Sequence, residues 1–512
     1  MVDRTRRTFE ILGFLAAFVL TIHAAGGAEE GLKIVPWPRS VAMQGGAVTL
    51  TAASRITTAN DTLMPLAKVL AEEILAVTGL KIVPAAGNSE AGDIELKLDP
   101  SLKGESYILN VGDRALVRGG NYGAVALGTV TLLQAIQGDG DKVSAARMIV
   151  SDKPQSDFRG LMIDVARQFH SIDNLKQIVQ MCRLYKIRYL QLHLTDDPLF
   201  MFPSKAYPLL GTKNEGGVKP YTLEQLKDLV AYADARNVTI IPEYEVPGHS
   251  AAANRAMPDL FMIRGTKPYE HHASINIAKP EVVKVVTTVV GEMCEVFRST
   301  PFFHIGGDEA DMALADQNEQ FKAAQKELGL SNHTELYRWF VSTMNDVVKK
   351  NKKTMIVWEG FGRHGKPKIP KDIIVMAYEV RFYQPNDLVA DGYRVINASW
   401  TPLYVVNKTV CPPEDIYAWN VFQFKPYGAK RSDNGVIVQP SPLVIGGQMC
   451  AWEQPEAAEI PSLRGRVPAM SERLWNPSAG KDFSHFNARF QSSDAIYTKL
   501  LNGLHSQQPA QP

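Results

Sequence analysis

Residues 174–197 read NLKQIVQMCRLYKIRYLQLHLTDD and contain the unit that decides the fold. The first part, residues 174–186, places apolar side chains at helical spacing, and RYLQLHL (188–194) is a short apolar strand. Asp196 follows where this strand runs out. A helix followed by an apolar strand, with acidic residues at the carboxyl end of the strand, predicts one unit of an α/β domain.

The same unit recurs from Arg159 onward. Amphipathic helices are predicted at 223–237, 281–297 and 334–350. The eight predicted strands are LMIDV (161–165), RYLQLHL (188–194), VTIIPEYE (238–245), PFFHIGG (301–307), TMIVWE (354–359), DIIVMAY (372–378), YRVINA (393–398) and LVIGGQM (443–449). This alternation favours a (β/α)8 TIM barrel. A doubly wound open sheet is the alternative, because periodicity alone does not show closure.

Polar and aromatic side chains gather where the predicted strands end. They are Asp164, Asp196, Glu243, Glu245, Asp308, Glu359, Tyr378 and Trp452. In a parallel barrel the carboxyl ends of the strands share one face, and catalytic sites are built on that face. The clustering therefore favours the barrel over the open sheet.

A different mixture of elements precedes the barrel. Strands IELKL (94–98), YILNV (107–111) and ALVRGG (115–120) accompany helices predicted at 66–79 and 122–136. We therefore expect a small α+β domain over residues 29–152 and the barrel over 153–505, joined near Pro154. The polar residues 506–512 are expected to form a disordered tail.

Composition excludes several classes of protein. The 512 residues include 45% hydrophobic ones, and 55 basic residues against 54 acidic ones leave a net charge of +1. No overall field or basic stripe would attract nucleic acid, so we expect no nucleic-acid partner. Four scattered cysteines are too few for a disulfide framework or a zinc site. The oligomeric state stays open.

The first residues have the layout of a signal peptide. Arg4, Arg6 and Arg7 precede an apolar run over residues 11–22, and the small residues AAGGA (24–28) follow. The run is too short to span a bilayer, so we expect export to the periplasm or outside the cell, with residues 1–28 removed and no stable membrane insertion. TRRTF also resembles a twin-arginine signal, and a retained anchor is the alternative.

Two adjacent acids in PFFHIGGDEA (301–310) suggest the chemistry. Asp308 and Glu309 follow an apolar strand and two glycines, which let the backbone turn sharply. Paired carboxylates suggest glycoside hydrolysis, in which one group stays protonated to donate to the leaving oxygen. Neighbouring side chains on a strand end diverge, however, so the two are poorly placed to flank one anomeric carbon.

HIGGDE resembles the signature of glycoside hydrolase family 20, the β-N-acetylhexosaminidases. Further motifs follow the order of that family: RGLMIDVARQF, LHLTDD, IPEYEVPGHS, VWEG, IGGQMCAWEQ and RVPAMSERLW. The resemblance implies an exo-acting retaining enzyme that removes terminal N-acetylglucosamine or N-acetylgalactosamine from glycans or chitooligosaccharides. In such catalysis the substrate's own acetamido group is the nucleophile and forms an oxazolinium intermediate, so no metal or organic cofactor is implied.

The resemblance also implies roles for individual residues. Asp308 would orient the acetamido N–H, and Glu309 would act as the general acid and base. Asp196 and His249 would form a relay behind Glu309, and Tyr404 would bind the acetamido oxygen. The implied substrate-binding residues are Arg159 as a clamp on the sugar hydroxyls, with His193, Trp358, Tyr378, Trp452, Gln454 and Asn407.

Departures from the family pattern lie at the rim of the expected site. Tyr378 stands in place of a tryptophan, Val406 in place of an aspartate with Asn407 beside it, and Gln454 in place of a glutamate. A family PEID reads Pro242 to Glu245 here, one methylene longer at its last residue. The choice between gluco and galacto sugars, and tolerance of a substituted sugar, therefore stay open. A carbohydrate-binding pseudoenzyme and a family member of other specificity, such as a lacto-N-biosidase or substituted-hexosamine hydrolase, are the alternatives.

Overall fold

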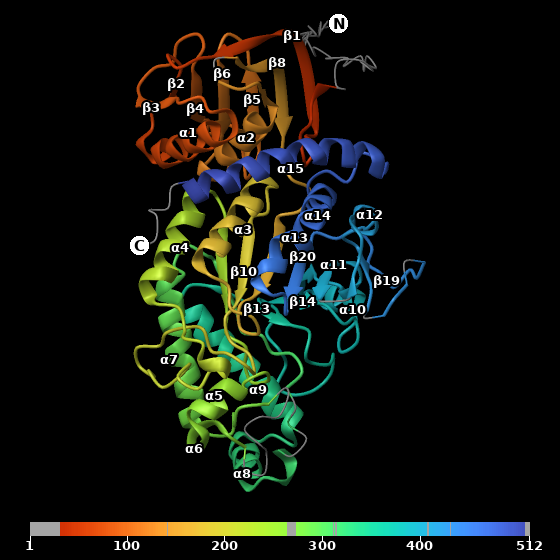
Figure 1. Cartoon of the computed structure of the whole chain (residues 1–512). Helices are drawn as coiled ribbons and strands as arrows, with labels where there is room; N and C mark the ends of the chain where they lie inside the picture. The colour runs from red at the N-terminus through yellow and green to blue at the C-terminus, as the bar shows by residue number, and fades with distance from the viewer. Residues whose placement is uncertain are drawn as a thin grey trace, which may run out of the picture.

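The structure is a computed structural model that describes residues 31–140, 142–263, 273–310, 312, 315–406, 409–426, 428–430 and 432–506. It consists of an N-terminal domain, a barrel and a long C-terminal helix between them (Figure 1). The expected signal peptide and residues 507–512 of the expected tail lie outside this range, so export stays a prediction. Among the described residues, no helix is both long and apolar enough to cross a membrane.

Eight parallel strands form the barrel. They are β9 (Phe158–Asp164), β10 (Tyr189–His193), β11 (Thr239–Glu243), β12 (Phe302–His304), β13 (Thr354–Trp358), β14 (Ile374–Ala377), β15 (Arg394–Asn397) and β20 (Val444–Trp452). The last strand, β20, pairs in parallel with both β15 and β9, which closes the ring. The predicted TIM barrel is therefore confirmed, and the open-sheet alternative is wrong.

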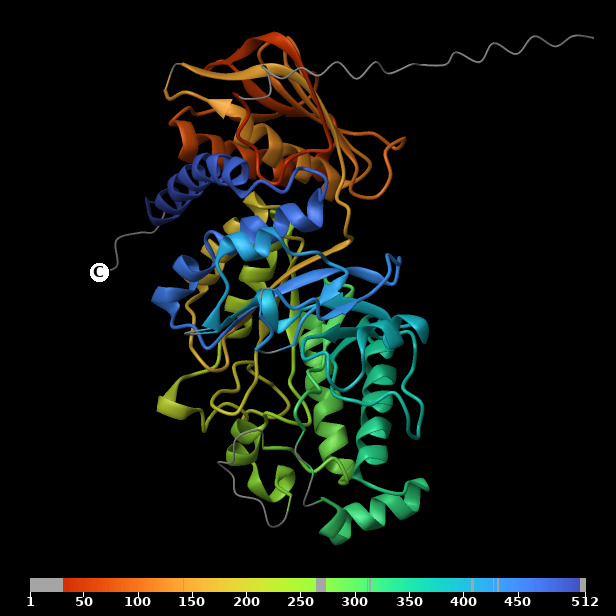
Figure 2. The same ribbon diagram turned by 90° about the vertical axis from the view of Figure 1, so that its right-hand side faces the viewer.

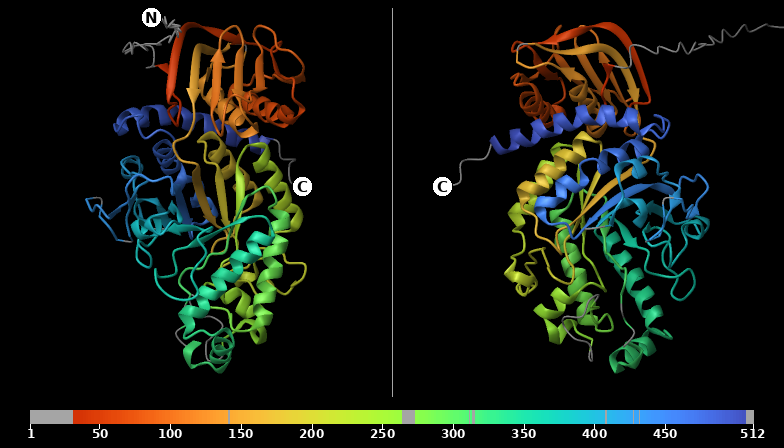
Figure 3. Two further views of the ribbon diagram at one scale, coloured as in Figure 1. Left: turned by 180° about the vertical axis from the view of Figure 1, so that it is seen from behind. Right: turned by 45° about the vertical axis from the view of Figure 1, so that its right-hand side comes forward.

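Helices surround the barrel, as Figures 2 and 3 show from other sides. Local sequence explains where they begin. The Thr222 hydroxyl and the Gln225 side chain form a capping box at the start of α4, and Ser171 caps α3. The helices after β9 are α3 (Ile172–Leu184), α4 (Leu223–Ala235), α5 (Ala251–Ala256), α6 (Pro258–Phe261), α7 (Pro280–Val296), α8 (Glu319–Leu328), α9 (His333–Lys350), α10 (Pro385–Ala390), α11 (Trp400–Leu403), α12 (Pro413–Tyr417), α13 (Glu456–Leu463), α14 (Arg466–Trp475) and α15 (Phe483–Ser506). Short strands β16 (Tyr404–Val406), β17 (Thr409–Val410), β18 (Gln423–Phe424) and β19 (Val436–Ile437) lie in the loops near β20.

The N-terminal domain is the predicted α+β unit. Its strands are β1 (Ser40–Leu50), β2 (Arg55–Thr58), β3 (Val83–Ala86), β4 (Ile94–Leu98), β5 (Tyr107–Val111), β6 (Ala115–Gly119), β7 (Ile136–Gln137) and β8 (Val143–Asp152). They form one sheet in the order β1-β8-β5-β6-β4-β2-β3, with β7 beside β8. Helices α1 (Met64–Thr78) and α2 (Tyr122–Ala135) cover the face of this sheet that points to the barrel (Figure 1).

The C-terminal helix α15 joins the two domains by packing against α1 and α3. A Cβ on Gly503 would lie 2.8 Å from the Cβ of Ala76, so only glycine permits this close approach. Buried charge adds to the interface. The Lys186 ammonium lies 2.9 Å from the hydroxyls of Tyr107 and Thr131 and 4.3 Å above the Trp475 ring. Burial lowers its pKa to about 8.

Arg159 belongs to this interface, which corrects its expected role as a sugar clamp. It is the second residue of β9, at the amino-terminal end of the strand, and its side chain is fully buried. The guanidinium donates to Glu105 of the N-terminal domain at 2.8 Å and 3.1 Å and to the carbonyls of Lys186 and Ser156. The carboxylate pair follows the opposite end of its own strand, so Arg159 holds the domains together and does not reach the site.

We expect Arg159→Met to lower the free energy of unfolding by roughly 2 to 4 kcal/mol, because it breaks a largely buried ion pair and leaves two buried carbonyls without a donor. Urea and thermal unfolding measure this loss. Arg147→Met is the control, since its pair with Asp113 is exposed and should contribute nothing measurable. Equal stability of the two variants would contradict the assignment.

Candidate active site

The loop after β12 positions the two adjacent acids. Gly306 and Gly307 have φ values of 67° and 102°, which turn the chain sharply before Asp308. A Cβ on Gly306 would lie 1.8 Å from Oε2 of Glu245, so this position requires glycine. The turn leaves the Asp308 side chain 12% exposed and the Glu309 side chain 39% exposed. Asp308 therefore faces the buried end of the site, and Glu309 faces its opening.

A chain of polar side chains leads from Glu309 into the barrel. His249 Nε2 lies 3.4 Å from Glu309 Oε2 and 4.0 Å from Asp308 Oδ2. On its other side, His249 Nδ1 lies 3.4 Å from Asp196 Oδ1. Arg167 completes the chain, because its Nη2 lies 2.9 Å from Asp196 Oδ2. The structure thus brings together the expected relay of Asp196, His249 and Glu309.

The surroundings of His249 set its proton affinity. Burial by itself lowers the pKa of the imidazole, but the charge and hydrogen bond of Asp196 and the hydrogen bond to Glu309 together raise it well above its ordinary value. Arg167 and His249 hold the pKa of Asp196 well below its ordinary value, although burial alone would raise it. Asp196 is therefore ionised, and His249 carries a proton readily.

Glu245 lies directly behind Asp308. Its Oε1 accepts from the backbone N–H of Gly307 at 2.7 Å. Asp308 Oδ1 and Glu245 Oε2 are both buried, and among the described residues neither oxygen has a partner other than the facing carboxyl group. Burial and the charge of Asp308 raise the pKa of Glu245 well above its ordinary value, with a side-chain hydrogen bond between the two acids. The raised pKa favours Glu245 as the protonated member of the pair, which makes it the donor to the Asp308 carboxylate.

Four aromatic side chains form a closed box beside Asp308. Ring centroids are 5.6 Å apart for Trp358 and Tyr378, 6.2 Å for Tyr378 and Tyr404, 6.0 Å for Tyr404 and Trp452, and 6.0 Å for Trp452 and Trp358. Burial raises the pKa of both tyrosines well above the ordinary value, so both hydroxyls stay protonated. The Tyr378 hydroxyl is buried and has no partner among the described residues. The four rings therefore provide apolar faces and two hydroxyl groups beside Asp308.

Glu243 supports this box from below. It accepts from Trp358 Nε1, His193 Nδ1 and Gln191 Nε2 at 2.7 Å, 2.7 Å and 2.8 Å. The second ring nitrogen of His193 lies 2.7 Å from Asp196 Oδ2, and its ring meets Trp452 edge-on at 5.0 Å. Although burial opposes it, the two carboxylates raise the pKa of His193 to about 10. His193 therefore lies beneath the site with both nitrogens occupied, where it orients Asp196 and Trp452.

Within the described part of the chain, two groups of side chains have the spacing of a cation site. His193, Glu243 and Glu245 form one, and Asp196, Asp197 and His249 form the other, each with ligand atoms within 4.8 Å of one another. Both groups already contain positive partners. His193 neutralises Glu243, and Arg167 neutralises Asp196. The donor sets are therefore better suited to internal ion pairs than to a bound metal.

Gln454 and Val406 occupy the positions of the expected rim. Gln454 is 5% exposed, and its amide donates to the carbonyl of Trp452 at 2.9 Å. Asn407 lies outside the described residues, so its expected role is untested. Val406 ends β16 beside Trp452. The rim thus has uncharged residues at the two positions where the family pattern has carboxylates.

Arg167 is the arginine of the site that sequence reasoning missed. It follows the carboxyl end of β9, its guanidinium lies 5.0 Å from the centre of the Trp452 ring, and it contacts both Asp164 and Asp196. RGLMIDVAR contains two arginines, one at each end of the strand. Strand direction distinguishes them, because only the second lies on the carboxyl face. The sequence places Glu245 among the acids at the strand ends and one methylene longer than the family pattern, but it does not predict the contact with Asp308, which depends on the turn at Gly306.

Known proteins share this architecture. The model of the glycosyl hydrolase family 20 catalytic domain matches residues 157–478, and the model of domain 2 of that family matches residues 31–153. A β-hexosaminidase of Porphyromonas gingivalis is 26% identical over 94% of this chain and 66% of its own length, and one of Vibrio furnissii is 28% identical over 68% and 60%. The chain thus spans about two thirds or less of the length of these relatives.

Solved structures agree on the fold. The family 20 exo-β-N-acetylglucosaminidase of Vibrio harveyi superposes with a TM-score of 0.79 at 23% identity, covering 94% of this chain and 79% of that one. The β-N-acetylhexosaminidase of Bacteroides fragilis gives a TM-score of 0.79 at 20% identity, covering 92% and 96%. Because the catalytic-domain model spans more than half of the sequence, this chain belongs to glycosyl hydrolase family 20.

Proposed function

We propose that the protein is an exo-acting, retaining β-N-acetylhexosaminidase that cleaves terminal N-acetylglucosamine or N-acetylgalactosamine from glycans. The observation that carries this proposal is the aromatic box with Asp308 beside it. An acetamido group fits each part of the box: its methyl group suits the four rings, its carbonyl suits the Tyr404 hydroxyl, and its N–H suits Asp308. Relatives named β-hexosaminidases, and a Vibrio harveyi structure in complex with N-acetylglucosamine, support this substrate class.

The arrangement supports substrate-assisted catalysis. The acetamido oxygen would attack the anomeric carbon while Glu309 donates a proton to the glycosidic oxygen, so that the bond to the leaving group breaks. This forms an oxazolinium ring, whose positive charge Asp308 would stabilise. Water entering past the exposed Glu309 would then give a proton to Glu309 and attack the anomeric carbon, whose bond to the acetamido oxygen breaks. This step restores the acid and the acetamido group and retains the configuration.

His249 would support the second half of this reaction. Once Glu309 has given up its proton, a carboxylate stands 3.4 Å from an imidazole that is already paired with Asp196. A protonated His249 stabilises that carboxylate until water arrives. A binding protein would not need this relay, so its presence favours the enzyme over a pseudoenzyme.

Glu245 would fix the orientation and the charge of the Asp308 carboxylate. One oxygen of the Asp308 carboxylate would accept a hydrogen bond from protonated Glu245, which fixes the carboxylate in position. The second oxygen would then accept from the acetamido N–H of the substrate. The pKa of Asp308 is raised overall, because burial and the nearby Glu309 charge outweigh His249 and the hydrogen bond from Glu245, which lower it. A neutral donor from Glu245 therefore helps Asp308 to stay ionised in a buried place.

We also propose that the protein acts after export. The support is the basic and apolar layout of residues 1–28 and a substrate class that occurs on extracellular and cell-wall glycans. The linkage and the natural glycan stay open.

Release of nitrophenol from its β-N-acetylglucosaminide tests the proposed activity. We expect turnover, with formation of the β-anomer of the free sugar as the first product, because two inversions at the anomeric carbon restore the configuration. Proton NMR of the early reaction distinguishes the anomers. Folded protein that binds N-acetylglucosamine without turnover at any pH between about 4 and 8 would favour the pseudoenzyme.

Glu309→Gln should discriminate between leaving groups. General acid catalysis contributes about 10² to 10⁴ in rate, so the variant should lose that factor with an oligosaccharide but much less with a nitrophenyl leaving group. The ratio of kcat/KM for the two substrates gives the result. His249→Gln is the matched comparison and should show a smaller loss in the same direction. Equal losses on both substrates would contradict the acid role of Glu309.

Glu245→Gln should remove a pH dependence of the free energy of unfolding. It should keep most of the activity, because the amide still donates to Asp308. In the native protein, the stabilisation from protonated Glu245 is complete below its ordinary pKa of 4.5 and is lost as the pH rises through its raised folded pKa. Urea unfolding from acidic to alkaline pH should therefore show a flatter profile for the variant.

Glu245→Ala is the matched control, since it removes the donor. We expect kcat to fall about tenfold or more, equivalent to one lost charge-assisted hydrogen bond of about 1.5 kcal/mol. A steep loss of activity in Glu245→Gln as well would contradict the proposal that protonated Glu245 donates to Asp308. So would a pH profile of unfolding that is unchanged in both variants.

A further inference from the structure

Two loops at the carboxyl face of the barrel carry side chains that meet at the candidate site. Arg167 lies in the loop after β9, and its guanidinium is 5.0 Å from the centre of the Trp452 ring at the end of β20. Close to the strands, the backbone N–H of Glu453 donates to Asp164 at 3.2 Å. The position of one loop relative to the other therefore determines how the arginine meets the ring of the aromatic box.

A second, buried connection between the same loops lies farther along the chain. His170 Nε2 is 3.0 Å from Glu459 Oε2, and the two side chains are 0% and 1% exposed. His170 belongs to the loop that carries Arg167, and Glu459 belongs to α13, the helix that follows β20. Beside this pair, Glu456 at the start of α13 accepts from the backbone N–H of Ser171 at 2.8 Å. These contacts join α13 to the far end of the β9 loop.

The hydrogen bonds of His170 show that its contact with Glu459 depends on one shared proton. His170 Nδ1 lies 3.0 Å from the carbonyl oxygen of Gln168, which can only accept, so Nδ1 carries a proton. The contact of Nε2 with Glu459 therefore needs one further proton, which the imidazole or the carboxyl group can hold. Without it, an imidazole lone pair would face a buried carboxylate whose Oε1 has no partner among the described residues. The contact is therefore intact only while the pair keeps this proton.

The groups around the pair favour retention of this proton. Burial by itself lowers the pKa of His170, but the hydrogen bond and charge of Glu459 and the charge of Asp164 raise it above its ordinary value of 6.5. Burial and Asp164 also raise the pKa of Glu459, whereas His170 lowers it. The other titratable groups beside the pair are Glu456 and Tyr221, whose hydroxyl donates to the His170 carbonyl at 2.7 Å. The pair therefore keeps its shared proton at neutral pH.

We propose that His170 and Glu459 are positioning residues for the sugar site, because their hydrogen bond holds the loop of Arg167 against the end of β20. Both side chains are buried, so they act through Arg167 and Trp452 and not by contact with the sugar. Arg167 also pairs with Asp196 at 2.9 Å, so a displaced loop would weaken the relay as well. The inference rests on the proposed function for the identity of the ligand, but it does not depend on turnover.

Two substitutions of Glu459 test the proposal by calorimetric titration of the full-length protein with N-acetylglucosamine. Glu459→Leu removes the contact with His170, whereas Glu459→Gln keeps it, because the amide donates to the neutral imidazole. At about pH 6 we expect Glu459→Leu to bind the sugar about tenfold more weakly than the native protein, and Glu459→Gln to bind it equally well. The dissociation constants give the result.

The pH profile of binding tests the shared proton, and it does so even if Glu459→Leu does not fold. The stabilisation from a raised histidine pKa is complete below 6.5 and is lost as the pH rises through the folded value. Native binding should therefore weaken between about pH 6 and 10 more than binding by Glu459→Gln, which has no such proton to lose. Other groups of the site titrate in both proteins, so the difference between the two profiles reports the pair. Identical profiles would overturn the proposal.

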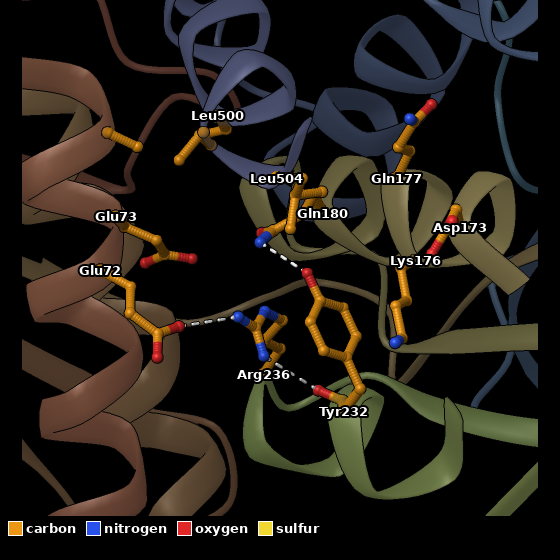
Figure 4. Close-up of a pocket in the computed structure, with 12 residues that line it drawn as sticks. Glu72, Glu73, Asp173, Lys176, Gln177, Gln180, Tyr232, Arg236, Leu500 and Leu504 are labelled. Atoms are coloured by element: carbon orange, nitrogen blue, oxygen red, sulfur yellow. Dashed lines mark hydrogen bonds and ion pairs between the residues drawn. The ribbon is translucent and has the colours of Figure 1, made fainter. Parts of the chain in front are cut away.

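Gln180→Leu is the matched control, because it removes a buried hydrogen bond at the opposite end of the barrel. Figure 4 shows Gln180 of α3 beside the Tyr232 hydroxyl, to which it donates at 2.9 Å, in the wall of a cavity next to the N-terminal domain. This variant should lose stability but keep native sugar binding and its pH profile. Thermal unfolding checks that each variant is folded before titration.

The outcomes separate this inference from the proposed function. Native binding by folded Glu459→Leu, or equal losses of binding in Glu459→Leu and Gln180→Leu, would overturn the positioning role alone. Binding without turnover would contradict the hydrolytic activity alone, since the titrations still report the contact. A native protein that does not bind N-acetylglucosamine would overturn both.

Discussion

Several carboxylates are buried at the carboxyl-terminal face of the barrel, and their mutual repulsion is the constraint on which the rest of the site depends. The surrounding residues neutralise most of these charges. Closure of eight parallel strands brings their carboxyl ends, and the acids that follow them, to one face. Different acids are neutralised in different ways. Arg167 pairs with Asp164 and Asp196, His193 lies between Asp196 and Glu243, and the raised pKa of Glu245 favours its neutral form. Asp308 and Glu309 are left as the acids that face the substrate side.

Backbone strain is also present on the same face. Non-glycine residues with positive φ follow several barrel strands, among them His249 at 45°, Glu309 at 46° and Glu453 at 58°. Such conformations cost of order 1 kcal/mol each and persist only where the surrounding structure imposes them. Here they aim His249 and Glu309 at each other, so the strain accompanies the geometry that proton transfer requires.

The two ends of the barrel have different tasks. The carboxyl face carries the acids and the aromatic box. The amino face is attached to the N-terminal domain through Arg159, Lys186 and Arg183, whose partners Glu105, Asp152 and Glu73 all belong to that domain. Buried ion pairs are strongly destabilising when one partner is removed. Stability and chemistry are therefore separated along the barrel axis.

The sequence by itself determined the features that depend on local order. Alternating apolar strands and amphipathic helices predicted the barrel, and the acids at strand ends predicted Asp196, Asp308 and Glu309, because strand ends and their neighbours in sequence stay together in any fold. Only the tertiary structure decided closure, through the pairing of β20 with β9. It also decided which of two arginines joins the site: Arg159 and Arg167 share one motif, but strand direction places them at opposite ends of β9. The contact of Glu245 with Asp308 was equally inaccessible from sequence, because it depends on a turn at Gly306 in a neighbouring strand's loop, where the missing Cβ makes room for the carboxyl group.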